Sequence, residues 1–425
     1  MDLELSEEGG ELLGLRVVSG GTAPVPGQAV FVLLRLRGRP VGTLLTRIPD
    51  PVGDGPRIHL LQAARDTLRR RPPRADGEGP PPGPPPRTTT IVATRERPGQ
   101  LARALDSLLA QDHPDHEILV VDNAPQTGST RELVEHGYAP LGVRYVREDT
   151  PGLAVAHNRG IAAADPRSTV LAFTDDDVVA DPRWATALAA PFAADPRLGC
   201  VTGLILPARL QTPAQVLLES HGGFAKGFVP RTYDPERPPA DEPLFPFTAG
   251  RFGSGAGMAF RARALREIGG FDPATGTGTP ARGGDDLYGF IRVLTAGYRL
   301  HYTPDALVWH HHRETWQDLR NQAFGYGAGL TACLTALIAR RPGLLPALIA
   351  RLPRGLAHAR AMTAGRGGSA TDDAVPGEHG SRAHPWPREL SRLERRGMLH
   401  GPLGYLKARR RLRGAARTPW ETTTS

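Results

Sequence analysis

Three groups of residues in this chain combine types and spacings that can support chemistry. The first is Asp175-Asp176-Asp177, which directly follows the apolar run 170–173. Adjacent carboxylates repel one another unless a cation lies among them, and the alternate members Asp175 and Asp177 can point at one position. Carboxylate oxygens are the ligands that Mg²⁺ and Mn²⁺ prefer. We therefore expect a divalent metal site here; the alternative is an acidic loop whose side chains are only solvated.

The second group is a pair of carboxylates, Asp285 and Asp286, which follow two glycines at the start of an amphipathic helical pattern. An aspartate at a helix N-terminus commonly caps the helix, but capping needs only one of the two. A second carboxylate that faces a cleft can take a proton from a hydroxyl group. We expect Asp286 to be a general base and Asp285 to orient it.

The third group is the histidine cluster 310–312, which ends the apolar run 306–309. Neutral imidazole is a good ligand for Mn²⁺, so His310 is expected to complete the site begun by Asp175 and Asp177. Strand alternation places His310 and His312 on one face. The alternative is a surface histidine cluster with no particular role.

The elements that must position these groups alternate between strand and helix patterns from residue 88 onward. Strands are expected at 88–93, 117–122, 143–147 and 170–175, and helices at 99–111, 129–137 and 152–164. This rhythm predicts an α/β domain with a mostly parallel sheet. Ligands of such sheets bind at the carboxyl ends of the strands, so the polar residues that follow the strands are the first candidates for a ligand site.

The length of 425 residues allows two to three domains of about 150 residues each. The 50 glycines and 42 prolines indicate extensive loops between folded parts. We expect four parts: a small α+β accessory domain over 1–70, with strands at 28–36 and 40–45 and a helix at 56–71; a Pro-rich linker over 71–87; a catalytic domain over 88–330; and a basic helical extension over 331–425 with a disordered loop near 364–387.

Two cysteines cannot build a disulfide framework or a cysteine-based zinc module, so a reducing compartment and a cytoplasmic location are expected. The first eight residues are acidic and lack the basic-then-apolar order of a secretory signal. No run of about 18 uncharged apolar residues occurs, so no membrane-spanning helix is predicted.

The formal net charge of +8 comes from the C-terminal part, where residues 331–425 hold 17 Lys/Arg against 6 Asp/Glu. Two short apolar helices with arginines at their ends, at 330–341 and 344–352, and the basic run 407–413 can lie on an anionic membrane surface. The alternative is that the helices pack on the catalytic domain and the basic run is solvated. The tail lacks interleaved aromatic residues, so nucleic acid is not expected as a partner.

In their order, the motifs resemble the family 2 nucleotide-sugar glycosyltransferases with a GT-A fold, over residues 88–329. The segments that carry the resemblance are 91–97, 117–123, 152–160, 174–177, 253–261, 268–272, 285–286 and His310. Several ordered motifs over about 240 residues are far more specific than any one of them. In three places the chain departs from the family pattern: Asp285 stands where glutamate is usual, His157 where arginine is common, and Gly257 where asparagine is frequent.

The resemblance implies transfer of a sugar, with inversion, from a nucleotide-diphosphate sugar to an acceptor hydroxyl, with Mn²⁺ or Mg²⁺ as cofactor. A UDP-sugar is the favoured donor, and the acceptor is a glycan, a lipid-linked molecule or a small molecule. The implied metal ligands are Asp175, Asp177 and His310, with Asp286 as base beside Asp285. The residues implied to bind the nucleotide sugar are Thr94, Arg95, Glu96, Asp122, Asn123, Asn158, Asp175 and Asp176.

Two other functions compete with this interpretation. A sugar nucleotidyltransferase uses a similar sheet, but it usually opens with a Gly-rich phosphate loop, and residues 93–99 contain only one glycine. An inactive transferase-fold scaffold tethered to a membrane would have no need of Asp175, Asp177, Asp286 and His310 together.

Overall fold

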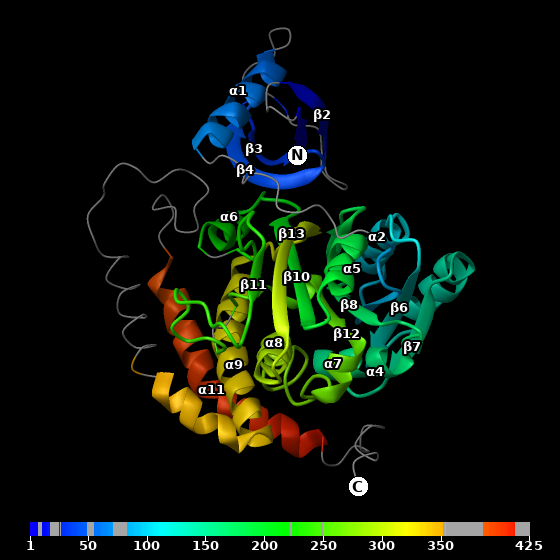
Figure 1. The fold of residues 1–425 in the computed structure, drawn as a ribbon, viewed down its shortest axis with the longest axis vertical. Coiled ribbons are helices and arrows are strands. Elements are labelled where there is room, and N and C mark those ends of the chain that lie inside the picture. The colour runs from blue at the N-terminus through cyan, green and yellow to red at the C-terminus, as the bar shows by residue number, and fades with distance from the viewer. Residues whose placement is uncertain are drawn as a thin grey trace.

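Two β-sheets, one small and one large, form the framework of the protein (Figure 1). The structure is a computed structural model that describes residues 1–6, 11–17, 25, 27–48, 55–70, 83–221, 223–247, 250–351, 353 and 386–412. Most of the predicted linker, 71–82, and all of the predicted disordered loop except residues 386–387 lie outside the described residues.

The small sheet has the strand order β2-β1-β3-β4 and packs against one helix. Its elements are β1 (Asp2–Leu5), β2 (Leu12–Arg16), β3 (Ala29–Leu36), β4 (Arg39–Arg47) and α1 (Gly55–Arg70). β3, β4 and α1 lie where the sequence predicts them, whereas β1 and β2 were not predicted. β1 nevertheless lies inside the sheet, parallel to β3, with Leu3 and Leu5 fully buried.

Both faces of β3 are buried, which explains its unbroken apolar run. Val32 and Leu34 point into the core beneath α1, while Leu33 points the other way into a cluster with Val179 and Trp309 of the large sheet. Successive strand residues face opposite sides, so this alternation seats the small sheet directly on the large one.

The large sheet has nine strands in the order β11-β13-β10-β12-β8-β5-β6-β7, with β9 paired to β13. Its strands are β5 (Thr88–Thr94), β6 (His116–Asn123), β7 (Arg144–Glu148), β8 (Val170–Asp175), β9 (Val178–Ala180), β10 (Leu198–Pro207), β11 (Arg231–Tyr233), β12 (Met258–Arg261) and β13 (Arg299–His310). All except β9, β11 and β12 run in the same direction. The predicted α/β architecture with a mostly parallel sheet is confirmed.

Helices cover both faces of this sheet. The helices of this part of the chain include α2 (Pro98–Leu109), α3 (Ser129–Glu132), α4 (Leu153–Ala163), α5 (Trp184–Ala194), α6 (Pro213–Ser220), α7 (Ala262–Glu267), α8 (Asp285–Thr295), α9 (Trp316–Arg340) and α11 (Arg388–Leu412). Of these, α4, α7 and α8 lie on one side of the sheet and α2 and α5 on the other. The helix predicted at 129–137 is α-helical only to Glu132 and continues as a π-helical turn, Leu133–Tyr138. Successive β5 residues pack into two separate cores, Ile91 on the α4 side of the sheet and Val92 on the α2 side.

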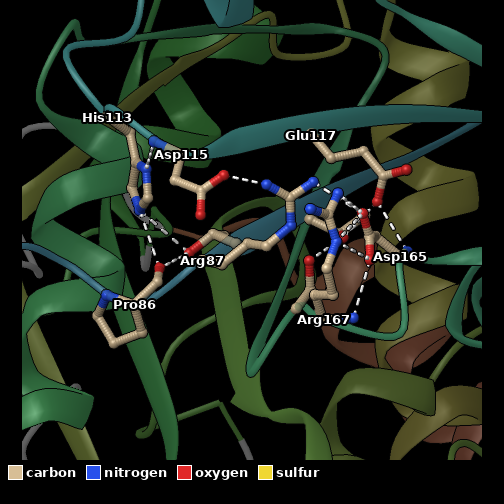
Figure 2. Close-up of polar contacts among 10 residues, drawn as sticks. Pro86, Arg87, His113, Asp115, Glu117, Asp165 and Arg167 are labelled. Atoms are coloured by element: carbon tan, nitrogen blue, oxygen red, sulfur yellow. Dashed lines mark hydrogen bonds and ion pairs between the residues drawn. The ribbon is translucent and has the colours of Figure 1, made fainter.

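An ion-pair network links the segments that lead into the amino ends of the central strands (Figure 2). Arg87, the residue before β5, pairs with Asp115 before β6 and with Asp165 before β8, the latter at 2.8 Å. Arg167 also binds Asp165, at 2.7 Å. The network attaches the end of the predicted linker to the edge of the sheet opposite to the one where ligands are expected.

The C-terminal helices differ from the prediction. The helix expected at 330–341 is the second half of α9, which begins at Trp316 and runs through the expected domain boundary at 330. α9 is long and apolar enough to cross a membrane by length and composition, with 44% of its most apolar stretch buried. The expectation of only short C-terminal apolar helices is therefore wrong. α9 packs beside α11 and contacts the start of α8 (Figure 1).

The two sheets are also joined by a buried charge network. Arg35 of β3 is 4% exposed; its Nε donates to Asp2 at 2.8 Å and its Nη2 donates to Asp181 at 2.6 Å. Asp181 directly follows β9, so the small sheet is tied to the strand that begins one residue after Asp177.

Replacing Arg35 with methionine should destabilise the protein by about 3–5 kcal/mol, because buried Asp181 would lose its close cation and buried Asp2 would keep only Arg16 as a cation within the described residues. Urea unfolding followed by tryptophan fluorescence measures this loss. The matched control is Arg131→Ala, which breaks an exposed pair with Glu135 and should leave the unfolding midpoint unchanged. A loss below about 1 kcal/mol for Arg35→Met would contradict a structural role for the network.

Candidate functional site

Strand register brings the predicted ligand residues to one edge of the sheet. β5 runs parallel to β6 and β8, with Thr94 opposite Asp122 and Ala93 opposite Asp175. Thr94, Asp122 and Asp175 therefore end three neighbouring strands at the same level. This is the carboxyl edge, where α/β sheets bind ligands.

The predicted metal ligands meet at this edge although His310 lies more than 130 residues after Asp175 and Asp177 in the chain. β9 pairs with β13 so that Val178 lies opposite His310, which places Asp177 beside the histidine. The His310 Nε2 atom lies 3.3 Å from Asp177 Oδ1. One ligand atom from each of Asp175, Asp177 and His310 lies within 4.8 Å of the others, and we refer to these three side chains as the metal cluster. Two carboxylates and one imidazole form a donor set that suits Mn²⁺ or Mg²⁺ and fits a divalent ion.

The electrostatics of the cluster also favour a cation. Burial, and then the neighbouring Asp177 carboxylate, raise the pKa of Asp175 to about 7. Burial also acts to raise the pKa of Asp177, but His310, Arg313 and Arg97 outweigh it and hold that pKa below its ordinary value. Burial acts to lower the pKa of His310, but Asp177 and Asp175 outweigh it and raise that pKa. The raised pKa thus favours the protonated form of Asp175, while cationic side chains pair with Asp177.

A second layer of side chains orients His310. Its Nδ1 lies 3.0 Å from Nδ1 of His312, whose Nε2 lies 3.1 Å from Glu219 Oε2 on α6. The structure places His310 and His312 together, as strand alternation predicts. Glu219 was missed, because it lies 93 residues from His312 on a short helix with no sequence signal that links the two. Metal-binding histidines commonly have such a partner on the second ring nitrogen.

Asp176, the middle member of the triplet, faces away from the metal cluster. It accepts a hydrogen bond from the Thr94 hydroxyl at 2.7 Å and one from Arg97 at 3.2 Å. Arg97 also lies 3.6 Å from Asp177. Asp176 therefore fixes the end of β5 beside the metal cluster, and Arg97 is a cation at the site that the sequence analysis did not single out.

Asp122 keeps an unused acceptor in a buried position. Its Oδ2 accepts a hydrogen bond from the Tyr145 hydroxyl at 2.9 Å, while its buried Oδ1 has no partner among the described residues. Burial raises the pKa of Asp122, and the bond from Tyr145 opposes the rise. A buried oxygen without a donor is costly, so this atom is suited to accept an N–H group from a ligand.

The other residues predicted to bind the nucleotide sugar differ in whether their side chains are already hydrogen-bonded within the protein. Arg95 is exposed, but Glu96 accepts backbone N–H groups from Gln126 and Thr127 at 2.7 and 3.0 Å. Asn123 bonds the Thr150 carbonyl and the Gly152 amide, and Asn158 bonds the Phe271 carbonyl and amide.

The carboxylate of Glu96 and the amide groups of Asn123 and Asn158 are therefore engaged within the protein. They position loops around the site instead of presenting free groups to it. The sequence shows the residue types but not these internal partners.

The predicted acid pair lies at the first two positions of α8. Asp285 is buried, with Oδ2 3.5 Å from Nδ1 of His157, whereas Asp286 remains partly exposed. Asp286 accepts the backbone N–H groups of Leu287 at 2.8 Å and Gly255 at 3.1 Å. Burial, and then the adjacent Asp285, raise the pKa of Asp286 to about 6. Asp286 is thus the more accessible carboxylate, with a pKa close to neutrality.

Backbone geometry explains why glycines precede this pair. Gly284 adopts φ +87°, and a Cβ atom there would lie 2.2 Å from the Gly329 carbonyl oxygen of α9. Only glycine combines a left-handed conformation with so close an approach. Gly327, two residues before Gly329 in α9, lies against the Glu394 carbonyl of α11.

One short turn connects the acid pair to the metal cluster. Gly255 donates to Asp286, and the next residue, Ala256, accepts a 2.8 Å hydrogen bond from Thr174, which precedes Asp175. The structure therefore places the metal cluster and the acid pair in one contiguous site at the edge of the sheet.

The pre-mycofactocin glycosyltransferases of two Mycobacterium tuberculosis strains are 29% identical to the chain over 178 residues. That match covers 41% of this chain and 33% of each relative, so the chain matches about a third of the length of these relatives.

Two solved structures resemble the chain at low sequence identity. A mannosyltransferase from Pyrobaculum calidifontis, solved with GDP-Man and Mn²⁺, has a TM-score of 0.49 and 20% identity, with 82% of this chain and 94% of that chain covered. GalNAc-T7, solved with UDP, GalNAc and Mn²⁺, has a TM-score of 0.41 and 19% identity, with coverage of 57% and 47%.

The sequence model of one protein family, described as glycosyltransferase like family 2, matches residues 84–325. This match covers more than half of the chain and includes all the site residues described above. The chain therefore belongs to glycosyltransferase family 2.

Proposed function

We propose that this protein transfers a sugar from a nucleotide-diphosphate sugar to an acceptor hydroxyl with inversion, and that the reaction depends on Mn²⁺ or Mg²⁺. One observation carries the proposal. The cluster of Asp175, Asp177 and His310 is joined through a single turn to Asp286, a partly exposed carboxylate. A binding module would need one of these groups but not both.

The metal cluster would stabilise the diphosphate leaving group. A divalent ion held by Asp175, Asp177 and His310 would neutralise the diphosphate as it leaves. The protein supplies two further cations beside the cluster, Arg97 and Arg313, at 3.6 and 3.8 Å from Asp177. We propose that both contact phosphate oxygens, and that the hydrogen bonds of His312 to His310 and Glu219 orient His310 toward the metal.

Asp286 accounts for activation of the acceptor. Each of its oxygens accepts one backbone N–H, which leaves further lone pairs to accept the proton of an incoming hydroxyl. Asp285 faces His157 and is buried, so one accessible carboxylate serves the acceptor. One base without a carboxylate nucleophile supports a single displacement, which inverts the anomeric centre.

The free Oδ1 atom of Asp122 supports a base whose ring N–H points into the protein. We propose uracil, and hence a UDP-sugar, as the donor base to test first, with guanine as the comparison because it also presents a ring N–H. The acceptor is proposed to be a hydroxyl of a glycan, a lipid-linked molecule or a small molecule. We also propose a cytoplasmic location, supported by two free, buried cysteines, Cys200 and Cys333.

The first test is release of free nucleotide from a panel of UDP- and GDP-sugars incubated with the protein and Mn²⁺. Without an acceptor, water takes its place, so slow release is expected from one donor class. EDTA should abolish the release because the diphosphate loses its counter-charge. Release that is unchanged by EDTA would contradict metal dependence, and no release from any donor, with or without candidate acceptors, would contradict transferase activity.

Substitution within the aspartate triplet separates metal binding from loop structure. Asp177→Ala should weaken Mn²⁺ binding at least about tenfold, because it removes one of three protein ligands. Asp176→Asn is the matched control and should keep Mn²⁺ affinity within a few-fold, because that side chain bonds Thr94 and Arg97. Calorimetric titration with Mn²⁺ in the absence of nucleotide measures both. Equal affinities in the two variants would rule out the ligand assignment.

The role of Asp286 can be read from turnover and its pH profile at saturating Mn²⁺. Because the base must be ionised and its pKa is raised to about 6, turnover should fall as pH drops through about 6 and level off above it. Asp286→Asn should lower turnover about 10²-fold or more and remove this acid limb, with donor affinity within a few-fold of the wild type. Asp66→Asn, an exposed change in α1, is the control. A parallel loss of donor affinity in Asp286→Asn would argue for a binding role instead.

A further inference from the structure

Helix α11 has one face that is fixed to the protein and one that is not. Its inner face is built from small residues that allow close contact with α9. A Cβ atom on Gly397 would lie 2.1 Å from the Phe324 carbonyl oxygen, and one on Gly401 would lie 2.4 Å from that of Ala328. Tyr405, also on this face, is fully buried and donates to Asp272 at 3.2 Å. α11 is thus held against the body of the protein in one orientation.

The opposite face of α11 exposes three leucines. Leu399, Leu403 and Leu406 are 79%, 69% and 46% exposed, the first two being the most exposed large apolar side chains in the described part of the chain. Their spacing of four and three residues places them on one line along the helix. Such a stripe adds nothing to the packing on α9, and a continuous exposed apolar patch usually marks an interaction site.

Cations flank the leucine stripe at both ends. Exposed basic residues precede it and follow it, at Arg388, Arg392, Arg395, Arg396, Lys407, Arg410 and Arg411. At 100° per residue, Arg392, Arg395 and Arg410 lie within about 40° of Leu399, on the same face of the helix. The two acidic residues of α11 are less exposed, and Glu389 pairs with Arg320 of α9. The outer face is therefore apolar in the middle and positive at both ends.

From this arrangement we propose that the outer face of α11 docks on an anionic lipid bilayer, with the leucines in the interfacial zone and the arginines among the headgroups. Long basic side chains can reach headgroup phosphates while the neighbouring leucines enter the apolar zone. A second copy of the chain is a poorer occupant, because two such faces would bring like charges together. Nucleic acid would use the arginines but leave the leucines in water.

The docking face extends beyond the segments suggested by sequence alone. The sequence pointed to the apolar segments 330–341 and 344–352 and to the basic run 407–413, and the first of these lies in α9, which is packed against α8 and α11. The basic run begins in the last turns of α11, and the exposed leucines of that helix become evident only when the buried glycine face shows which side is turned outward. The proposal does not depend on the transferase activity.

The test uses flotation of the full-length protein with vesicles of phosphatidylcholine, alone or with about 30 mol% phosphatidylglycerol. The wild type should float with the anionic vesicles and not with the neutral ones, and added salt should weaken the binding. The triple variant Leu399→Gln/Leu403→Gln/Leu406→Gln should bind at least about tenfold more weakly, because insertion is lost. Arg392→Gln/Arg395→Gln/Arg396→Gln should lose the preference for anionic vesicles.

Leu141→Gln is the matched control, since Leu141 is 61% exposed but lies far from α11 in the chain, and this variant should float like the wild type. All the substituted leucines are exposed, so unchanged urea midpoints will show that the variants fold. Wild-type protein that stays in solution with both vesicles would overturn the proposal, as would full binding of the triple leucine variant. Self-association of the wild type that the leucine substitutions abolish would overturn it in favour of a second copy.

Discussion

The structure depends on one electrostatic constraint, the crowding of carboxylates at the ends of neighbouring strands. Asp122, Asp175, Asp176 and Asp177 come together because parallel strands end at a common edge. Their mutual repulsion is met in different ways. Asp176 accepts hydrogen bonds from Thr94 and Arg97, and Asp177 pairs with His310. Burial and the neighbouring carboxylates raise the pKa of Asp175. The site is thus arranged to gain stability when a divalent cation and a polyanionic ligand arrive together.

β13 is the element that turns this acidic edge into the proposed metal site. It brings His310 to the edge, and through β9 it holds the backbone around Asp177: the His311 amide donates to the Asp177 carbonyl at 2.9 Å. The small N-terminal sheet packs on the same region through Leu33 and through the Arg35–Asp181 pair. The accessory sheet therefore supports the strands that carry two of the three metal ligands.

Much of the catalytic fold could be predicted from the sequence because each strand has a strong local signal. An apolar run that ends in Asp122 or Asp175 predicts both a strand and the position where that strand ends. The partners of Glu96, Asn123 and Asn158 could not be predicted, because each depends on a loop brought close only by tertiary packing. β1 was missed because four residues are too few to show a pattern; its burial becomes evident only when β3 lies beside it. The length of α9 was missed, because the predicted helix began at residue 330, after the Gly-rich segment Gly325–Gly329.

That Gly-rich segment of α9 has a physical role at the site. Close contact between Gly329 and the Gly283–Gly284 pair sets where α8 begins, and α8 begins with Asp285 and Asp286. In the same turn of α9, Gly327 and Ala328 contact α11, so α9 lies between the start of α8 and the C-terminal helix. A side chain at Gly284 or Gly329 would push the start of α8 away from Gly255 and so misplace Asp286. The glycines of α9 therefore help to fix the position of the proposed base.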